Sequence, residues 1–130
     1  MSRTAWPLQQ GVFQTLTTAL APVPVFDEVP ANSAFPYIEI GDQTAADNSD
    51  KTDRTTERVT LTIHVWSRTA GRKQCKELMA KVHTALHDKT LTLTGFAPAV
   101  LAFEFSNDFR DPDGITRHGV LRFGATITPP

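Results

Sequence analysis

The sequence predicts one α+β domain: a mostly antiparallel sheet of four to five strands, two helices packed on one face and a long β-hairpin at the C-terminus. The length of 130 residues suits a single domain. Two segments repeat apolar residues three to four apart, and several others alternate apolar and polar residues. Two helices are too few to cover both faces of a parallel sheet, so the strands should pair antiparallel.

The composition excludes several classes of protein. Hydrophobic residues make up 40% of the chain and charged residues 21%, which is typical of a globular fold rather than a disordered one. The formal net charge of −1 provides no field that would hold nucleic acid tightly. Cys75 is the single cysteine, so no internal disulfide forms, and we expect a cytoplasmic chain with neither an export signal nor a membrane span.

The first third of the chain reads as a helix followed by extended segments. From Trp6 to Leu20 the apolar residues recur three to four apart, at Val12, Phe13, Leu16 and Leu20, and Pro22 and Pro24 end the helix. Residues 25–26 form a short extended piece, and residues 35–40 form a strand that Gly41 closes. We therefore expect a helix that packs on an adjoining strand.

Residues 42–57 predict a long exposed loop. The segment contains no aromatic or branched aliphatic residue and is rich in Asp, Thr, Asn and Ser. Sixteen residues exceed the usual loop length in a compact domain, so such a loop is either functional or disordered until a partner binds it. We expect the loop to become ordered against a neighbouring subunit or against another protein of the same assembly.

The central segment reads as a half-buried strand and then a second helix. Residues 58–66 alternate strictly, with an aliphatic face from Val59 to Val65 and a Thr-rich face that carries His64 and Trp66. After a turn at residues 67–71, one apolar stripe of the helix comprises Cys75, Leu78, Met79, Val82 and Leu86. This helix should cover one face of the sheet.

The last third predicts three strands. Residues 90–94 alternate Leu and Thr, and Gly95 and Pro98 then break the chain. Two longer strands follow, joined by the turn sequence at residues 111–114. The core faces of these two strands should be Leu101, Phe103 and Phe105 on one, and Leu121, Phe123, Ala125 and Ile127 on the other.

No residue pattern completes a catalytic or metal site. His83 and His87 are four apart on a helix, as in some metal sites, but no third ligand accompanies them. The oxygen-rich run from Asp47 to Asp53 lacks the glycine and closing glutamate of a calcium loop. We expect no catalytic residues, no cofactor and no metal.

Three further groups have simple structural interpretations. Cys75 lies in the apolar stripe, where a thiol behaves as a small hydrophobe. The cations Arg68, Arg72 and Lys73 precede or open a helix, where phosphate binds in some proteins, but a solvated helix face explains them as well. His64 and His118 would support an enzyme, such as a small hydrolase, only if one of them met an acid in a pocket.

Several fragments in order along the chain resemble one family. They are Val25-Phe26-Asp27-Glu28-Val29-Pro30, Phe35 to Gly41, His64-Val65-Trp66-Ser67 with Gly71 before a helix, and Asp111-Pro112-Asp113-Gly114 followed by Arg117 to Phe123. Together they resemble the tail completion proteins of long-tailed bacteriophages. That group includes tail terminators and tail-to-head joining proteins, and it recurs in prophages and gene transfer agents.

The resemblance implies a structural virion protein at the head-proximal end of a tail, made in the cytoplasm of a host bacterium. Its partners would be itself in a ring, commonly of six subunits, the tail tube protein and the head-tail connector or stopper protein. The genome would pass through the ring without sequence-specific binding. Another connector or tail-tube component of the same kind of particle is the alternative, because small α+β domains serve there too.

The residues that we expect at a subunit or partner interface come from the long loop and from the Thr-rich face of the central strand. That face is too polar for a core yet carries a tryptophan, and the loop mixes both signs of charge. The predicted interface residues are Asp47, Asp50, Lys51, Asp53, Arg54, Arg58, His64 and Trp66.

Overall fold

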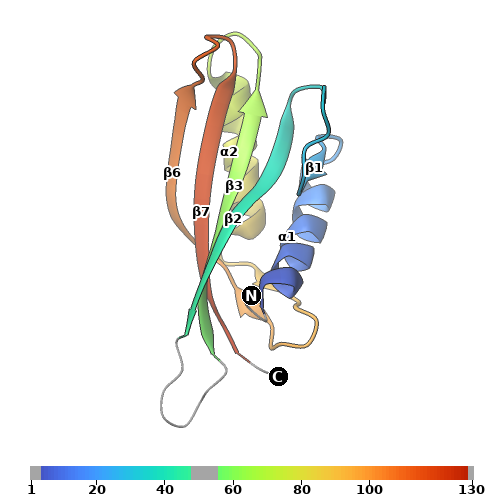
Figure 1. The fold of residues 1–130 in the computed structure, drawn as a ribbon, viewed down its shortest axis with the longest axis vertical. Helices are drawn as coiled ribbons and strands as arrows, with labels where there is room; N and C mark the ends of the chain where they lie inside the picture. Colours follow the sequence, from blue (N-terminus) through green and yellow to red (C-terminus); the bar gives the residue numbers. More distant parts are fainter. Residues whose placement is uncertain (1–3, 48–55, 129–130) are drawn as a thin grey trace.

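In the computed structural model, which describes residues 4–47 and 56–128, two helices lie on one face of a five-stranded sheet (Figure 1). The predicted α+β class, the two helices on one face and the C-terminal hairpin are confirmed. In sheet order the strands are β1 (Val25–Phe26), β2 (Tyr37–Asp47), β3 (Glu57–Ser67), β7 (Arg117–Ile127) and β6 (Ala102–Arg110). The helices are α1 (Ala5–Leu20) and α2 (Lys73–Leu86).

The sheet is mixed because β1 runs parallel to β2, whereas the other neighbouring strands are antiparallel. The helix α1 contacts β1 and β2, and α2 contacts β3, β7 and β6. Each helix therefore covers one half of the same sheet face. None of the helices among the described residues is long and apolar enough to span a membrane.

The core lies between the helices and the inner sheet face. The alternation predicted for the central strand holds, since Val59, Leu61, Ile63 and Val65 are all buried in β3. The predicted faces of α2 and β7 also hold, and that of α1 holds at Val12, Leu16 and Leu20 but not at Phe13, which is 40% exposed. Their buried residues include Leu8, Val12, Leu16 and Leu20 in α1, Cys75, Leu78, Met79, Val82 and Leu86 in α2, and Leu121, Phe123, Ala125 and Ile127 in β7.

The prediction of a loop over residues 42–57 is wrong at both ends. The strand β2 does not close at Gly41 but continues to Asp47, and β3 already begins at Glu57. The register shifts between Ile40 and Gln43, and beyond this bulge the backbone pairs with β3 as far as Asp47. Because ladder hydrogen bonds need no apolar side chains, the polar sequence concealed the strand. Residues 48–55 lie outside the described part.

The predicted core face of β6 is wrong at Phe105. The register shifts between Phe103 and Phe105, so that β6 advances by two residues while β7 advances by one. Phe103 still packs against Phe123 in the core, but Phe105 lies on the opposite face and is 48% exposed. A strand bulge inverts the alternation of every side chain after it.

The predicted strand at residues 90–94 is shorter in the structure. The strand β4 covers only Thr90–Leu91 and pairs with β5 (Ala99–Val100) in a separate two-stranded sheet. Leu93 is buried, but it lies in the connection beyond the strand. The Leu–Thr alternation therefore reflects the burial of Leu91 and Leu93 and not a strand that pairs along residues 90–94.

The turn between β6 and β7 is fixed by one carboxylate. Asp113 accepts hydrogen bonds from the backbone N–H groups of Ile115 and Thr116 at 2.9 and 2.8 Å and from the Thr116 hydroxyl at 2.6 Å. These bonds, led by the one from the Thr116 hydroxyl, lower the pKa of Asp113 to about 2. The predicted turn chemistry is confirmed and sets the hairpin register.

Candidate functional site

Neither helix covers the outer face of the sheet (Figure 1). A row of rings crosses this face. Every strand of the five-stranded sheet contributes one ring. The aromatic row consists of Phe26 on β1, Tyr37 on β2, Trp66 on β3, His118 on β7 and Phe109 on β6. Neighbouring centroids are 5.9, 6.4, 3.8 and 4.8 Å apart.

The strand register builds this row. Tyr37 pairs with Trp66, Trp66 pairs with His118, and His118 pairs with Phe109. Side chains directly opposite each other on one sheet face are within contact distance. The row therefore follows from three consecutive cross-strand pairs.

Histidine and tryptophan form the centre of the row. The rings of Trp66 and His118 stack with an interplanar angle of 14°, and the Trp66 indole N–H donates to Glu39 Oε1 at 3.1 Å. His64 Nδ1 and His118 Nε2 lie 2.7 Å apart, so one nitrogen donates to the other. This bond requires at least one neutral ring, because two imidazolium ions would both offer hydrogen.

Burial and neighbouring charge bias the protonation of this centre. Burial, followed by the influence of His64, lowers the pKa of His118 below its ordinary value of 6.5, and Asp111 and Glu39 only partly oppose the shift. Burial and then Glu39 raise the pKa of Tyr37. The His64–His118 bond is therefore favoured near neutral pH.

A glycine makes room for the His64 ring. A Cβ atom on Gly41 would lie 2.6 Å from His64 Cδ2 and Nε2 and 3.1 Å from the Thr62 carbonyl oxygen. Real Cβ contacts essentially never come below 3.0 Å. The β2 bulge begins at this point, so the missing side chain seats the ring against the strand backbone.

A charged cluster lies on the same face toward the other end of the sheet. Arg58 on β3 and Arg122 on β7 both pair with Glu104 on β6, and Arg122 Nε is 3.3 Å from Glu104 Oε1. The Arg58–Glu104 pair crosses β7 over Gly124, where a Cβ atom would meet both side chains. Gly124 therefore allows an ion pair to bridge two strands that are not neighbours.

The arrangement is chemically suited to binding a protein surface. Aromatic residues and arginine, both present on this face, are enriched in protein interfaces. Phe105 and Phe109 are 48% and 41% exposed. His118 Nδ1 lies 3.9 Å from Asp111 Oδ1, too far for a hydrogen bond, and its other nitrogen is bonded to His64.

The structure brings three of the predicted interface residues onto this face. Arg58, His64 and Trp66 lie on the outer side of β3; His64 and Trp66 have partners on neighbouring strands, and Arg58 pairs with Glu104 on β6, beyond β7. Asp47 lies at the exposed end of β2 opposite Glu57, away from the aromatic row. Asp50, Lys51, Asp53 and Arg54 lie outside the described residues.

Other groups singled out in the sequence are engaged within the chain. His87 Nδ1 accepts the Phe103 N–H at 3.0 Å, and His87 Nε2 is 3.2 Å from Asp88 Oδ2. Among the described residues, no group of three or more histidine, cysteine or acidic side chains is placed to hold a metal. Burial, followed by the effect of Asp108, raises the pKa of Cys75, which disfavours the reactive thiolate.

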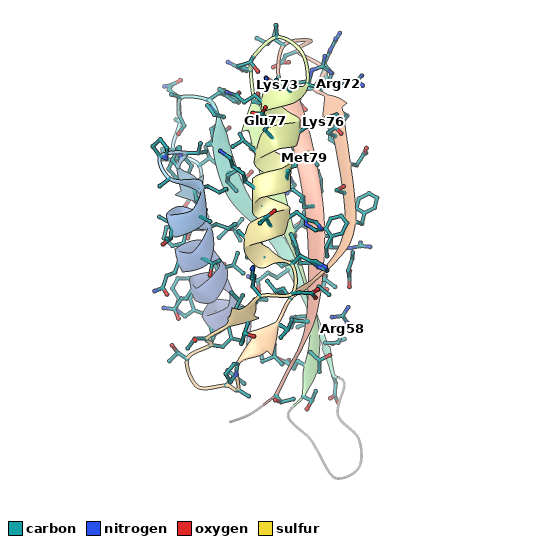
Figure 2. All side chains as sticks on the ribbon, turned by 180° about the vertical axis from the view of Figure 1, so that it is seen from behind. Arg58, Arg72, Lys73, Lys76, Glu77 and Met79 are labelled. Carbon is teal, nitrogen blue, oxygen red and sulfur yellow. The ribbon has the colours of Figure 1, made fainter. Side chains whose placement is uncertain are left out.

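The three basic residues near the start of α2 differ in their contacts. Arg68 stacks over Phe35 at 4.3 Å and donates to the Thr116 hydroxyl at 2.9 Å, so it fastens the hairpin turn to the β1–β2 connection. Arg72 and Lys73 are exposed at the start of α2, as Figure 2 shows. Lys73 lies 3.8 Å from Glu77 on the next turn.

The sequence reading missed Phe26, Tyr37 and Phe109 as members of a site. For Phe109 the predicted turn was not enough: pairing outward from residues 111–114 would set residue 109 opposite residue 116, whereas the connection spans residues 111–116 and sets Phe109 opposite His118. For Tyr37 the signal is weaker, because its register with Trp66 depends on strands joined through a long connection. Glu104 and Arg122 are brought together with Arg58 only by the sheet order.

The chain is similar to known proteins over most of its length. A family model described as tail completion protein gp17 matches residues 13–128. The tail completion protein gp17 of Bacillus phage SPP1 is 31% identical over 93 residues, which are 72% of this chain and 68% of that protein.

Two solved structures show the same architecture. A chain in the virion of a native gene transfer agent particle superposes with a TM-score of 0.84 at 28% identity, covering 98% of this chain and 99% of that chain. The bacteriophage SPP1 gp17 protein superposes with a TM-score of 0.62 at 24% identity, covering 98% and 97%, and this likeness concerns the fold.

Proposed function

This chain belongs to the tail completion protein gp17 family, and from that membership we propose that it is a structural protein of the tail of a phage-like particle. One observation carries the proposal. The chain matches, from end to end, a chain that is part of an assembled gene transfer agent virion. The full length of the domain is thus accounted for by a virion component.

In this proposal, copies of the chain close into a ring, of six subunits, at the head-proximal end of the tail tube. The ring terminates the tube and joins it to the head connector or stopper protein. The uncovered sheet face supports an assembled state, because a row of half-buried rings that ends in the exposed Phe109, with Phe105 also exposed on the same face, is typical of an interaction site. Small domains build such rings from one repeated contact.

The ring would let the genome pass without binding its sequence. The formal net charge of −1 supports this view, because a protein that holds DNA tightly neutralises many phosphates with an excess of basic residues. A passage that bound DNA strongly would also hinder its movement.

Particles made without this chain provide the test. Electron microscopy of such particles should show tails of uncontrolled length, or tails separated from filled heads. Supplying the unaltered chain in trans should restore joined particles. Normal tails joined to filled heads would exclude the proposal, and particles with no tubes at all would indicate a tube subunit instead.

The outer sheet face is tested by a single exposed side chain. We propose that the aromatic row contacts a partner subunit, so Phe109→Ala should reduce the yield of joined particles while the purified domain still folds. Val100→Ala is the matched control, since Val100 is 50% exposed but lies in the separate β4–β5 sheet. An assembled particle in which Trp66 faces only solvent would contradict this role.

The connection between β2 and β3 carries the remaining predicted interface residues. We propose that Asp50, Lys51, Asp53 and Arg54 contact a partner in the particle. Replacing residues 48–55 with a two-residue Asn-Gly turn would remove them while leaving the described strands intact. Normal assembly of that variant would remove the connection from the interface.

A further inference from the structure

The two edges of the sheet differ in charge. Every charged residue between Thr4 and Asp47, the segment that builds α1, β1 and β2, is acidic: Asp27, Glu28, Glu39, Asp42 and Asp47. On the opposite side, α2 carries Lys73, Lys76 and Lys81 against Glu77, β7 carries Arg117 and Arg122 with no acid, and the edge strand β6 carries Glu104, Asp108 and Arg110. The two groups of elements lie at opposite sides of the sheet (Figure 1).

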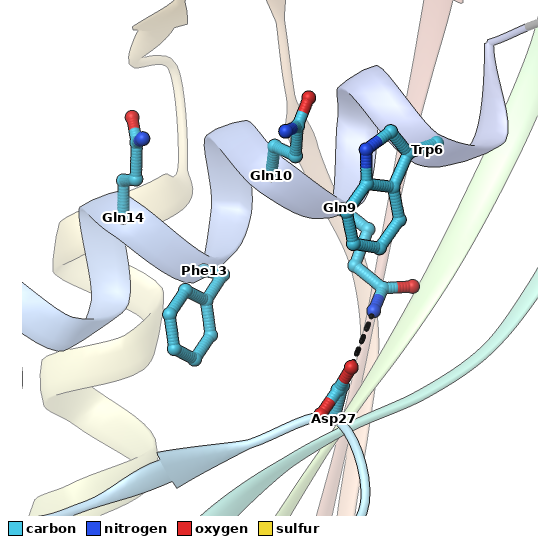
Figure 3. Close-up of a pocket in the computed structure, with 6 residues that line it drawn as sticks. All are labelled: Trp6, Gln9, Gln10, Phe13, Gln14 and Asp27. Atoms are coloured by element: carbon cyan, nitrogen blue, oxygen red, sulfur yellow. Dashed lines mark hydrogen bonds between the residues drawn. The ribbon is translucent and has the colours of Figure 1, made fainter.

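The first edge contains an exposed apolar groove. It is lined by Trp6, Gln9, Gln10, Phe13 and Gln14 of α1 and by Asp27 after β1, and has a volume of about 280 Å³ (Figure 3). Trp6 is 60% and Phe13 40% exposed. The Gln9 side-chain amide Nε2 donates a long hydrogen bond to Asp27 Oδ2 at 3.4 Å, so the carboxylate remains at the rim of the groove.

The composition of α1 is that of an interface rather than a solvated surface. None of its 16 residues is charged, although its outer side carries exposed glutamines, threonines and two large aromatic residues. Helices that face water normally carry charges on the exposed side. Interface cores are depleted in charge and enriched in Trp and Phe. We call Trp6, Phe13, Asp27 and Glu28 the acidic edge.

The opposite edge offers the matching chemistry. Phe105 and Phe109 are exposed on the edge strand β6, and Arg122 lies over the Phe105 ring at 5.7 Å. The two acids of β6 are already paired, Glu104 with Arg58 and Arg122, and Asp108 with Lys76 at 3.0 Å. Arg110 is exposed and forms no ion pair with the described residues. We call Phe105, Phe109, Arg110 and Arg122 the basic edge.

We propose that the acidic edge of one copy docks on the basic edge of the next copy. The proposal rests on the ring of the proposed function and names the two surfaces that form its repeated contact. A closed ring needs two different, mutually complementary patches on each subunit. This chain carries two such patches on opposite sides, each with two exposed aromatic residues and opposite charge, so a second copy is the occupant that fits both at once.

A charge exchange tests the pairing. Asp27→Arg alone should weaken self-association about tenfold, and Arg110→Glu alone should do the same, because each places like charges together. Both changes in one chain should restore association, since the reversed edges attract again. Lys81→Glu is the control, because Lys81 is exposed on α2 away from both edges. Sedimentation velocity measures the association, and circular dichroism verifies the fold.

A mixing experiment establishes the direction of the contact. A chain with Phe13→Ser and Asp27→Arg has only its basic edge intact, and a chain with Phe105→Ser and Arg110→Glu has only its acidic edge intact. Each alone should be monomeric, and an equal mixture should stop at a heterodimer. A contact between identical patches would give no heterodimer and would overturn the proposal.

Assembled particles provide the second measurement, which applies if the free chain is monomeric. Gln10→Cys and Asn107→Cys place one thiol on each edge, and Cys75 is buried. A bismaleimide should link the double variant into a ladder of multimers and leave each single variant unlinked. Joined particles without a ladder would overturn the edge pairing but leave the proposed function intact. Joined particles formed without this chain would instead refute the function.

Discussion

His118 takes part in several of the interactions on the outer face. It stacks on Trp66, contacts Phe109 and shares a hydrogen bond with His64. Burial lowers its pKa below the value of 6.5 that it has in an unfolded chain. At pH values between these two pKa values, the unfolded chain binds a proton that the folded chain does not bind.

The free energy of unfolding should therefore fall as the pH drops below about 6.5 and level off below the folded pKa of His118. Above pH 6.5 this contribution is fully present. Urea unfolding at a series of pH values should show a smaller acid-induced loss for His118→Gln than for the unaltered chain. His83→Gln controls for the loss of an imidazole on α2, and an unchanged pH profile in His118→Gln would contradict the prediction.

Gly41 and His64 form a second residue-scale pair. Gly41→Ala should destabilise the domain by about 1–3 kcal/mol, because the added Cβ would overlap the His64 ring and press on the Thr62 carbonyl oxygen. In a His64→Ala background the cost should be smaller, since only the carbonyl contact remains. Equal costs in both backgrounds, measured by chemical denaturation, would show that the ring does not occupy that space.

The β6–β7 hairpin depends on its turn at the scale of an element. Asp113→Ala removes the acceptor for two backbone N–H groups and the Thr116 hydroxyl, so the hairpin should lose stability. Because the pKa of Asp113 is lowered to about 2, its stabilising effect persists above about pH 4 and is lost as the pH falls toward 2. Asp113→Asn, which keeps the shape, should unfold with a smaller dependence on acid over that range.

Helices and strands were predictable from the sequence wherever a regular repeat of apolar side chains faced the core. The α2 stripe, the β3 alternation and the β7 face are all periodic in apolar residues, and burial enforced each of them. The second half of β2 and the position of Phe105 were not predictable in that way. Both follow bulges, which are set by backbone geometry and neighbouring strands rather than by a local apolar repeat.

The candidate site was predictable only in its central strand. His64 and Trp66 lie on a polar face that cannot be core, so the sequence marks them as surface residues with a role. The other rings of the row, Phe26, Tyr37, His118 and Phe109, come from four other strands, and the order of those strands is a property of the whole fold. No local pattern joins residues so far apart along the chain.

At the scale of the whole molecule, the separation of charge sets the conditions of assembly. The acidic α1–β1–β2 side and the basic α2–β7 side should attract each other between copies. Raising the ionic strength from about 0.05 to 0.5 M should slow association by about tenfold or more, because the screening length shortens to a few ångströms. Stopped-flow light scattering measures the rate. The Asp27→Arg variant should show a weaker dependence on salt.

The two halves of β2 should exchange their amide hydrogens at different rates. Residues Tyr37 to Ile40 contain the positions paired with β1 on one side and β3 on the other, whereas Gln43 to Asp47 pair with β3 alone. The second half is also exposed except at Gln43. Local opening of such an edge costs little free energy compared with global unfolding. In the isolated chain, deuterium should enter the second half of β2 while the first half is still protected. Protection of the second half is therefore the most direct report of contact with a partner.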